Sequence, residues 1–151
     1  KIRLLPLIYK VLKKSCKILS KNLPHHNKIM NILGKASGIL NKYRKLKYNL
    51  LAARDQDHDT LLTFGGAYSN HIAATAFAGA DKGFRTIGVI RGDELESAWQ
   101  DNPTLREANR AGMQFHFMNR QDYRLKTTAS VQDKLKQRWG KFYLIPEEGT
   151  N

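Results

Sequence analysis

The feature that most constrains the fold is an alternation of short apolar runs and helical segments between residues 60 and 145. The apolar runs predict strands at residues 60–64, 85–90, 113–118 and 142–145. The segments between them predict helices at residues 69–80, 105–111 and 128–139, with a start signal at Asn102-Pro103 and stop signals at Gly83 and Gly140. Asn41 as a plausible N-cap predicts a further helix at residues 43–53. Because strands that alternate with helices pair in parallel, the chain predicts an α/β fold: a parallel sheet with helices on both faces. Strands that are apolar almost throughout predict burial on both faces.

The excess of positive charge lies in the first third of the chain. The net charge is +13, and residues 1–50 contain 13 Lys and Arg but no Asp or Glu, which leaves residues 51–151 neutral. A basic arm of this kind is typical of proteins that bind nucleic acid or anionic membranes. A binding module built on residues 1–47 is therefore an alternative function.

The cysteine, the apolar runs and the histidines narrow the class of protein. Cys16 is the only cysteine, so an internal disulfide is excluded and a reducing compartment is favoured. No apolar run is long enough to span a membrane. We therefore expect a cytoplasmic protein. The histidines lack the spacing of metal ligands, so we expect no metal site.

Residues 1–40 differ in character from the rest of the chain. They contain no acidic residue and no convincing strand, and they are rich in Lys, Ile, Leu and Asn. Such a segment looks like the translation of an unrelated or shifted reading frame. We expect a fragment with a basic, atypical segment at residues 1–40 and a partial α/β domain at residues 41–151. A degraded, non-functional product is a further alternative.

The sequence TLLTFGGAYSNHIAATA at residues 60–76 places two glycines, a hydroxyl and an amide where a strand meets a helix. Ligands bind at the carboxyl ends of parallel strands, where Gly65 and Gly66 would lie. The first amide groups of the following helix suit a carboxylate or a phosphate, and Ser69 and Asn70 add directional hydrogen bonds. The alternative is a plain glycine turn in which Ser69 or Asn70 caps the helix.

A second segment, NKYRKLKY at residues 41–48, contains four cations within six residues. A lysine that is flanked by cations and removed from water has a lowered pKa, which makes it a candidate nucleophilic amine. The alternative is a solvated basic face, since Lys is mostly a surface residue.

Further motifs follow these two segments along the chain in a fixed order. NKYRKLKYNLLAA and TLLTFGGAYSNHIAATA are followed by GFRTIGVIRGDEL, NPTLREANRAGM, YR at 123–124 and FYLIPEEGTN. Residues 41–151 thereby resemble the 1-aminocyclopropane-1-carboxylate deaminase / D-cysteine desulfhydrase family of pyridoxal-phosphate enzymes. The resemblance implies part of a tryptophan synthase β-like (fold type II) structure. It also implies deamination or β-elimination of a small amino acid to a 2-oxo acid and ammonia.

The resemblance also assigns roles to individual residues. Lys42 matches the lysine that holds pyridoxal 5′-phosphate and moves the substrate α-proton, and Asn41 precedes it as in the family. Asn70 matches the asparagine that binds the 3′ oxygen of the cofactor. Ser69 and His71 match positions that face the substrate carboxylate and the reacting carbon, and Lys45 matches a lysine near the cofactor phosphate.

The chain departs from the family pattern in two places. The family is about twice as long, and its C-terminal half supplies the phosphate loop and the partner of the pyridine nitrogen. Ser37-Gly38 is separated from Asn41-Lys42 by two residues where the family has Ser-Gly-Asn-Lys, and Glu148 replaces a glycine. We therefore expect this chain alone to be inactive. For the full-length protein the resemblance implies a homodimer, and it weighs against nucleic acid as a partner.

Overall fold

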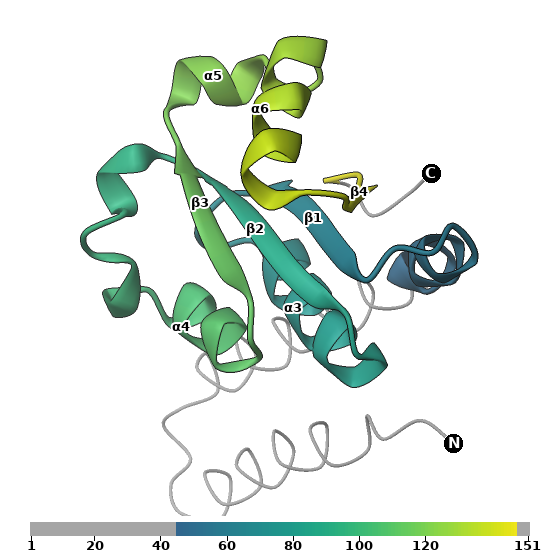
Figure 1. Ribbon diagram of the computed structural model, residues 1–151. Coiled ribbons are helices and arrows are strands. Elements are labelled where there is room, and N and C mark those ends of the chain that lie inside the picture. Colours follow the sequence, from purple (N-terminus) through teal and green to yellow (C-terminus); the bar gives the residue numbers. More distant parts are fainter. Residues whose placement is uncertain (1–44, 148–151) are drawn as a thin grey trace, which may run out of the picture.

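The computed structural model describes residues 45–147, which form a four-stranded parallel sheet in the order β3-β2-β1-β4 (Figure 1). The strands are β1 (Thr60–Gly65), β2 (Arg85–Arg91), β3 (Gln114–Met118) and β4 (Tyr143–Ile145). The chain adds strands outward from β1 to β3 and then crosses back, so that β4 pairs with the other side of β1. The carboxyl ends of β1 and β4 thus mark the point where strand order reverses. Ligands bind at this point in open parallel sheets.

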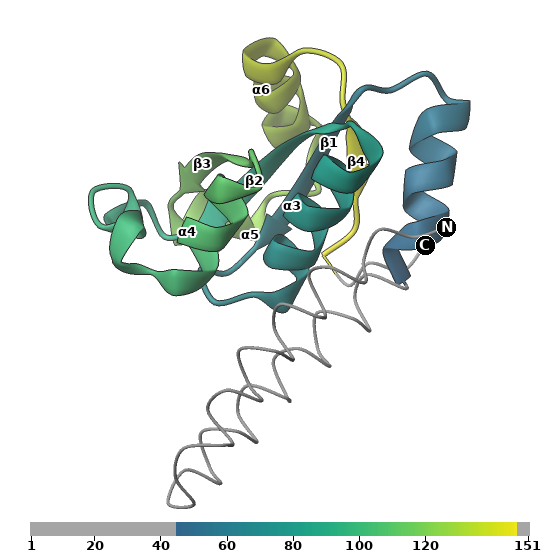
Figure 2. The same cartoon turned by 90° about the horizontal axis from the view of Figure 1, so that it is seen from below.

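Helices cover both faces of the sheet (Figure 2). One face carries α3 (Asn70–Lys82), α4 (Pro103–Arg110) and a helix over residues 45–55, here called helix 45–55. The other face carries α5 (Arg120–Arg124) and α6 (Ala129–Trp139). Two short 3-10 turns, η2 (Asp93–Leu95) and η3 (Trp99–Asp101), lie between β2 and α4. The predicted parallel α/β fold with helices on both faces is therefore confirmed for the described residues.

The side chains of β1 alternate between the two layers of the core. Leu62 and Phe64 pack in a cluster with α5 and α6, whereas Leu61 packs with α3 and helix 45–55. A third cluster joins α3 and α4 to β2. Successive residues of a strand point to opposite faces, so a run that is apolar throughout fits a strand covered on both sides.

The expectation of burial on both faces is correct for the two inner strands and wrong for the two outer ones. All of β1 and the five central residues of β2 are buried. In β3 only Met118 is fully buried, and in β4 only Ile145 is. Within residues 45–147, β3 and β4 have a strand neighbour on one side only, which leaves their outer residues partly open to solvent.

The predicted ends of the elements are correct to within one or two residues. The helix predicted from Ser69 begins at Asn70, because Ser69 is its N-cap and has an extended backbone (φ −73, ψ 123). Gly83 ends it in the left-handed conformation (φ 73). The sequence did not predict α5 or the 3-10 turns, since elements this short show no hydrophobic period. The helix predicted at residues 43–53 extends to residue 55, and its first two residues lie outside the described part.

Candidate active site

The turn from β1 into α3 uses its two glycines differently. A Cβ on Gly65 would lie 2.6 Å from Ile72 Cγ1, so α3 can pack this closely on the strand end only because Gly65 has no side chain. A Cβ on Gly66 would meet nothing within 4 Å, so the backbone there borders open space. Gly65 therefore serves helix packing, and Gly66 leaves room at the carboxyl edge of the sheet.

The first turn of α3 presents polar groups at this edge. The Oγ of Ser69 accepts a hydrogen bond from the His71 amide at 3.2 Å, and the Ser69 amide donates to the Gly66 carbonyl at 3.0 Å. Ser69 and Asn70 are both partly exposed, and the first turn contains no acidic residue. The positive end of the helix dipole is thus not neutralised by a carboxylate of that turn, which favours an anionic ligand.

The side chain of His71 points away from this open edge. It is 1% exposed, and its Nε2 lies 2.7 Å from the hydroxyl of Thr63 in β1. The Thr63 hydroxyl in turn donates to the Ile145 carbonyl of β4 at 3.0 Å. The structure therefore brings Ser69, Asn70 and His71 to one turn, with the imidazole in the core and the other two side chains near the surface.

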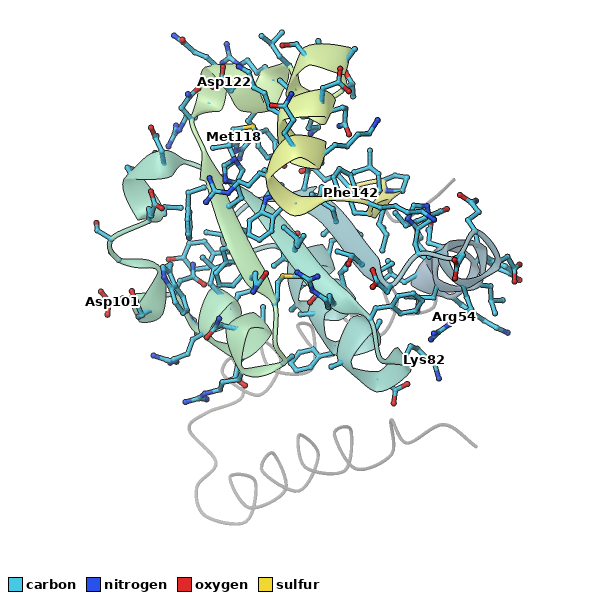
Figure 3. All side chains as sticks on the ribbon, viewed as in Figure 1. Arg54, Lys82, Asp101, Met118, Asp122 and Phe142 are labelled. Atoms are coloured by element: carbon cyan, nitrogen blue, oxygen red, sulfur yellow. The ribbon has the colours of Figure 1, made fainter. Side chains whose placement is uncertain are left out.

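Helix 45–55 runs alongside α3 in the same direction. The guanidinium of Arg54 donates to the Lys82 carbonyl at 2.6 Å, at the C-terminal end of α3 (Figure 3). Leu46 and Leu50 pack in one cluster with Ala74 and Ala78 of α3. The residue-45 end of the helix therefore lies toward the edge where α3 begins. Lys45 is exposed on this helix, whereas the sequence-predicted residues Asn41 and Lys42 lie outside the described residues.

A cluster that sequence reasoning missed lies at the carboxyl edge on the opposite face. The Nζ of Lys126 forms an ion pair with Glu147, two residues beyond β4, and lies 4.4 Å from the centre of the Tyr123 ring. The Tyr123 ring also meets Phe64 of β1 edge to face, with ring centres 5.8 Å apart. Burial, and then the negative charge of Glu147, raise the pKa of Tyr123. The sequence noted only the adjacent pair YR, because this contact forms through tertiary packing.

Three further ring-bearing side chains pack within the fold. His116 is half-buried in β3, where burial and then the positive charge of Arg138 lower its pKa. Trp99 packs on Phe115 at 5.2 Å between ring centres, and Trp139 packs against the α6 side of the core. Within residues 45–147 no three His, Cys, Asp or Glu residues are grouped as metal ligands would be.

Known proteins that match the chain share both its sequence and its fold. A bifunctional D-cysteine desulfhydrase/1-aminocyclopropane-1-carboxylate deaminase of Arabidopsis thaliana, named as mitochondrial, is 30% identical over 119 residues. A Thermotoga maritima protein named as a 1-aminocyclopropane-1-carboxylate deaminase is 32% identical over 113 residues. The solved structure of an ACC deaminase homologue superimposes with a TM-score of 0.55 at 28% identity. The resemblance to this deaminase/desulfhydrase family is confirmed.

The matches cover most of this chain and a minor part of each relative. The Arabidopsis alignment spans 74% of this chain and 29% of the relative, and the Thermotoga alignment spans 74% and 35%. The structural match covers 72% of this chain and 33% of the other. The chain thus spans about a third of the length of the family proteins that it matches. No protein-family model matches it, and no helix among residues 45–147 is long and apolar enough to cross a membrane.

Proposed function

We propose that this chain is the lysine-bearing part of a pyridoxal-phosphate-dependent deaminase or desulfhydrase that acts on a small amino acid. The observation that carries the proposal is the first turn of α3. Ser69 and Asn70 stand there at the carboxyl edge of β1, beside the open space over Gly66 and with no acidic residue in the turn. This is the place and the polarity that a carboxylate or phosphate group requires.

The polar groups of this turn divide between the cofactor and the substrate. The side-chain amide of Asn70 is suited to hydrogen-bond the 3′ oxygen of pyridoxal phosphate, and the Ser69 hydroxyl to bind the substrate carboxylate. The backbone amide of His71 donates to Ser69 Oγ, so His71 contributes to the substrate side by orienting that hydroxyl. When bound, the cofactor withdraws electrons from the bonds of the substrate α-carbon.

The amine that holds the cofactor is assigned to Lys42, with Asn41 beside it and Lys45 near the phosphate. These three assignments follow the family resemblance. Their support in the structure is the direction of helix 45–55, whose residue-45 end lies toward the edge that carries Ser69. In this arrangement Lys42 holds the cofactor and moves the α-proton, while the α3 turn orients the substrate.

The proposal extends to the whole protein. It includes a cytoplasmic location, which the single cysteine favours, and a boundary near residue 40, where the basic composition ends. It also includes a homodimer for the full-length protein, which the family resemblance implies. The Arabidopsis relative is named as mitochondrial, so location differs within the family. For this chain alone we propose cofactor binding without turnover, since it spans about a third of its relatives.

Covalent trapping tests the assignment of Lys42. Incubation with pyridoxal phosphate, borohydride reduction and peptide mass spectrometry identify the lysine that carries the cofactor. We expect the adduct on Lys42 in the wild-type chain and its loss in Lys42→Ala. Lys47→Ala is the matched control, because Lys47 is an exposed lysine of helix 45–55. Equal labelling of many lysines, or an adduct that survives in Lys42→Ala, would refute the assignment.

The excess charge of residues 1–50 supports a second candidate, a module that binds nucleic acid or anionic membranes through residues 1–47. Its signature is steep weakening of binding as salt increases, because each phosphate contact releases counterions. A deletion that ends at residue 40 tests it, since Leu46, Leu50 and Ala53 belong to the core and must be kept. Unchanged binding in that deletion would exclude this candidate.

A further inference from the structure

A buried hydrogen-bond chain crosses the sheet directly beneath the turn that carries Ser69 and Asn70. The Nε2 of His71 lies 2.7 Å from the Thr63 hydroxyl, and that hydroxyl lies 3.0 Å from the Ile145 carbonyl. Thr63 is completely buried and His71 is 1% exposed. The chain therefore joins the start of α3, the middle of β1 and the end of β4 without contact with solvent.

The chemistry of the three groups fixes the direction of both bonds. The Ile145 carbonyl can only accept, so the single hydroxyl proton of Thr63 is donated to it. Thr63 then has only lone pairs left for His71, and Nε2 must carry the proton that forms the second bond. In its neutral form the imidazole is consequently held as the Nε2–H tautomer.

We infer that Thr63 is a positioning residue that sets the orientation of the α3 turn through His71. Neighbouring residues of an α-helix are separated by about 100° around its axis. An imidazole that is anchored to β1 on the inner side of the turn therefore fixes the direction in which Asn70 leaves the helix. The same hydroxyl donates to the carbonyl of Ile145, the last residue of β4. The distance between the α3 turn and the carboxyl end of β4 is therefore fixed.

The register of the sheet explains why position 63 can do this. Thr63 is paired with Ile145 across the β1–β4 ladder, at the point where strand order reverses. Its side chain lies on the face covered by α3, since Leu62 and Phe64 point to the opposite layer. A hydroxyl at this position reaches both the helix and the neighbouring strand, which an aliphatic side chain of the same shape cannot bridge by hydrogen bonds.

Only the expected effect on cofactor binding rests on the proposed function. Two substitutions separate that effect from the hydrogen-bond chain itself. Thr63→Val keeps the shape and removes the hydroxyl, whereas Thr63→Ser keeps the hydroxyl. Thr75→Val is the matched control, because Thr75 of α3 is also fully buried and its hydroxyl has no hydrogen-bond partner among the described residues. All variants are made in the full 151-residue chain.

The first readout needs no cofactor. Long-range proton–nitrogen NMR of the His71 imidazole, assigned with His71→Gln, reports which ring nitrogen carries the proton. We expect the Nε2–H pattern in the wild-type chain, in Thr63→Ser and in Thr75→Val, and its loss in Thr63→Val. A wild-type Nδ1–H pattern, or an Nε2–H pattern unchanged in Thr63→Val, would overturn the inference.

The second readout measures the consequence at the site. We expect pyridoxal phosphate to bind about tenfold more weakly to Thr63→Val than to Thr75→Val, with faster amide hydrogen exchange confined to the first turn of α3. Equal affinity and equal exchange in the two variants would refute a positioning role. If Thr63→Val does not fold, the wild-type and Thr63→Ser spectra still decide the hydrogen-bond chain. A wild-type chain that shows the Nε2–H pattern but no cofactor binding would refute the proposed function and leave the hydrogen-bond chain supported.

Discussion

The guanidinium of Arg54 donates a 2.6 Å hydrogen bond to the carbonyl of Lys82, which joins helix 45–55 to the end of α3 (Figure 3). The same guanidinium lies 4.4 Å from the centre of the Phe84 ring. Two helices that β1 separates in the sequence are thereby held in parallel. Through this contact the helix that follows the predicted cofactor lysine keeps a constant direction relative to α3.

Replacement of Arg54 should weaken this junction. Arg54→Lys keeps the charge but cannot reproduce the planar contact with Phe84, so we expect a loss of about 0.5–1.5 kcal/mol in the free energy of unfolding. Urea denaturation measures it. Lys47→Ala, at an exposed position of the same helix, should stay within about 0.5 kcal/mol of the wild-type chain. A loss as large in Lys47→Ala would show that the effect is not specific to the junction.

Gly65→Ala should destabilise the packing of α3 on β1. The added Cβ would lie 2.6 Å from Cγ1 and 2.9 Å from Cδ1 of the fully buried Ile72, so the helix or the strand must shift. We expect a loss of about 1–3 kcal/mol, the usual cost of inserting atoms into a packed core. Gly66→Ala is the control, since a Cβ there meets nothing within 4 Å. Equal urea midpoints for the two variants would contradict this account of Gly65.

Asp57→Gly should stabilise the chain. Asp57 lies between helix 45–55 and β1 with φ 54, the one non-glycine residue with positive φ among residues 45–147. Glycine adopts this conformation without a Cβ clash, which favours the variant by about 0.5–1 kcal/mol. The Asp57 carbonyl, which accepts from Lys141 Nζ at 3.0 Å, is retained. Asp57→Ala should not be stabilised, and a melting temperature that rises equally in both variants would exclude this cause.

Tyr123 should make the stability sensitive to alkaline pH. Burial, followed by the charge of Glu147, raises its pKa in the folded chain above the ordinary value of 10.0. The folded chain therefore holds the phenol proton more tightly than the unfolded chain does. This contribution is complete below pH 10.0 and is lost as the pH rises above it. We expect a steeper alkaline loss of unfolding free energy in the wild-type chain than in Tyr123→Phe, measured by urea denaturation across pH. Parallel curves would refute it.

Local sequence signals predicted the elements well. Asn102 followed by Pro103 marked a helix start, and the Asn102 side chain accepts from the amides of Thr104 and Leu105 at 2.9 and 3.1 Å. Gly83 and Gly140 marked helix ends, and both have positive φ in the structure. These signals act between residues that are close in the sequence, so no tertiary contact is needed to recognise them.

Contacts between distant segments were not predictable in this way. The short helix α5 has no hydrophobic period, so the sequence does not reveal it. The ring of Tyr123 contacts Lys126, which is paired with Glu147, only because the folded chain brings these segments together. His71 was expected to face substrate because of its place in a motif, whereas its burial against Thr63 depends on the pairing of β1 with β4.

By itself, the sequence determined the α/β class and the order of strands and helices along the chain. These properties follow from side-chain periodicity and local backbone preferences, which act over a few residues. The motifs and their order carried the family resemblance. Only the tertiary structure decided which side chains of the turn stay near the surface, which are buried, and which distant residues join them. Strand order and helix packing set those contacts, and they arise from burial across the whole sheet.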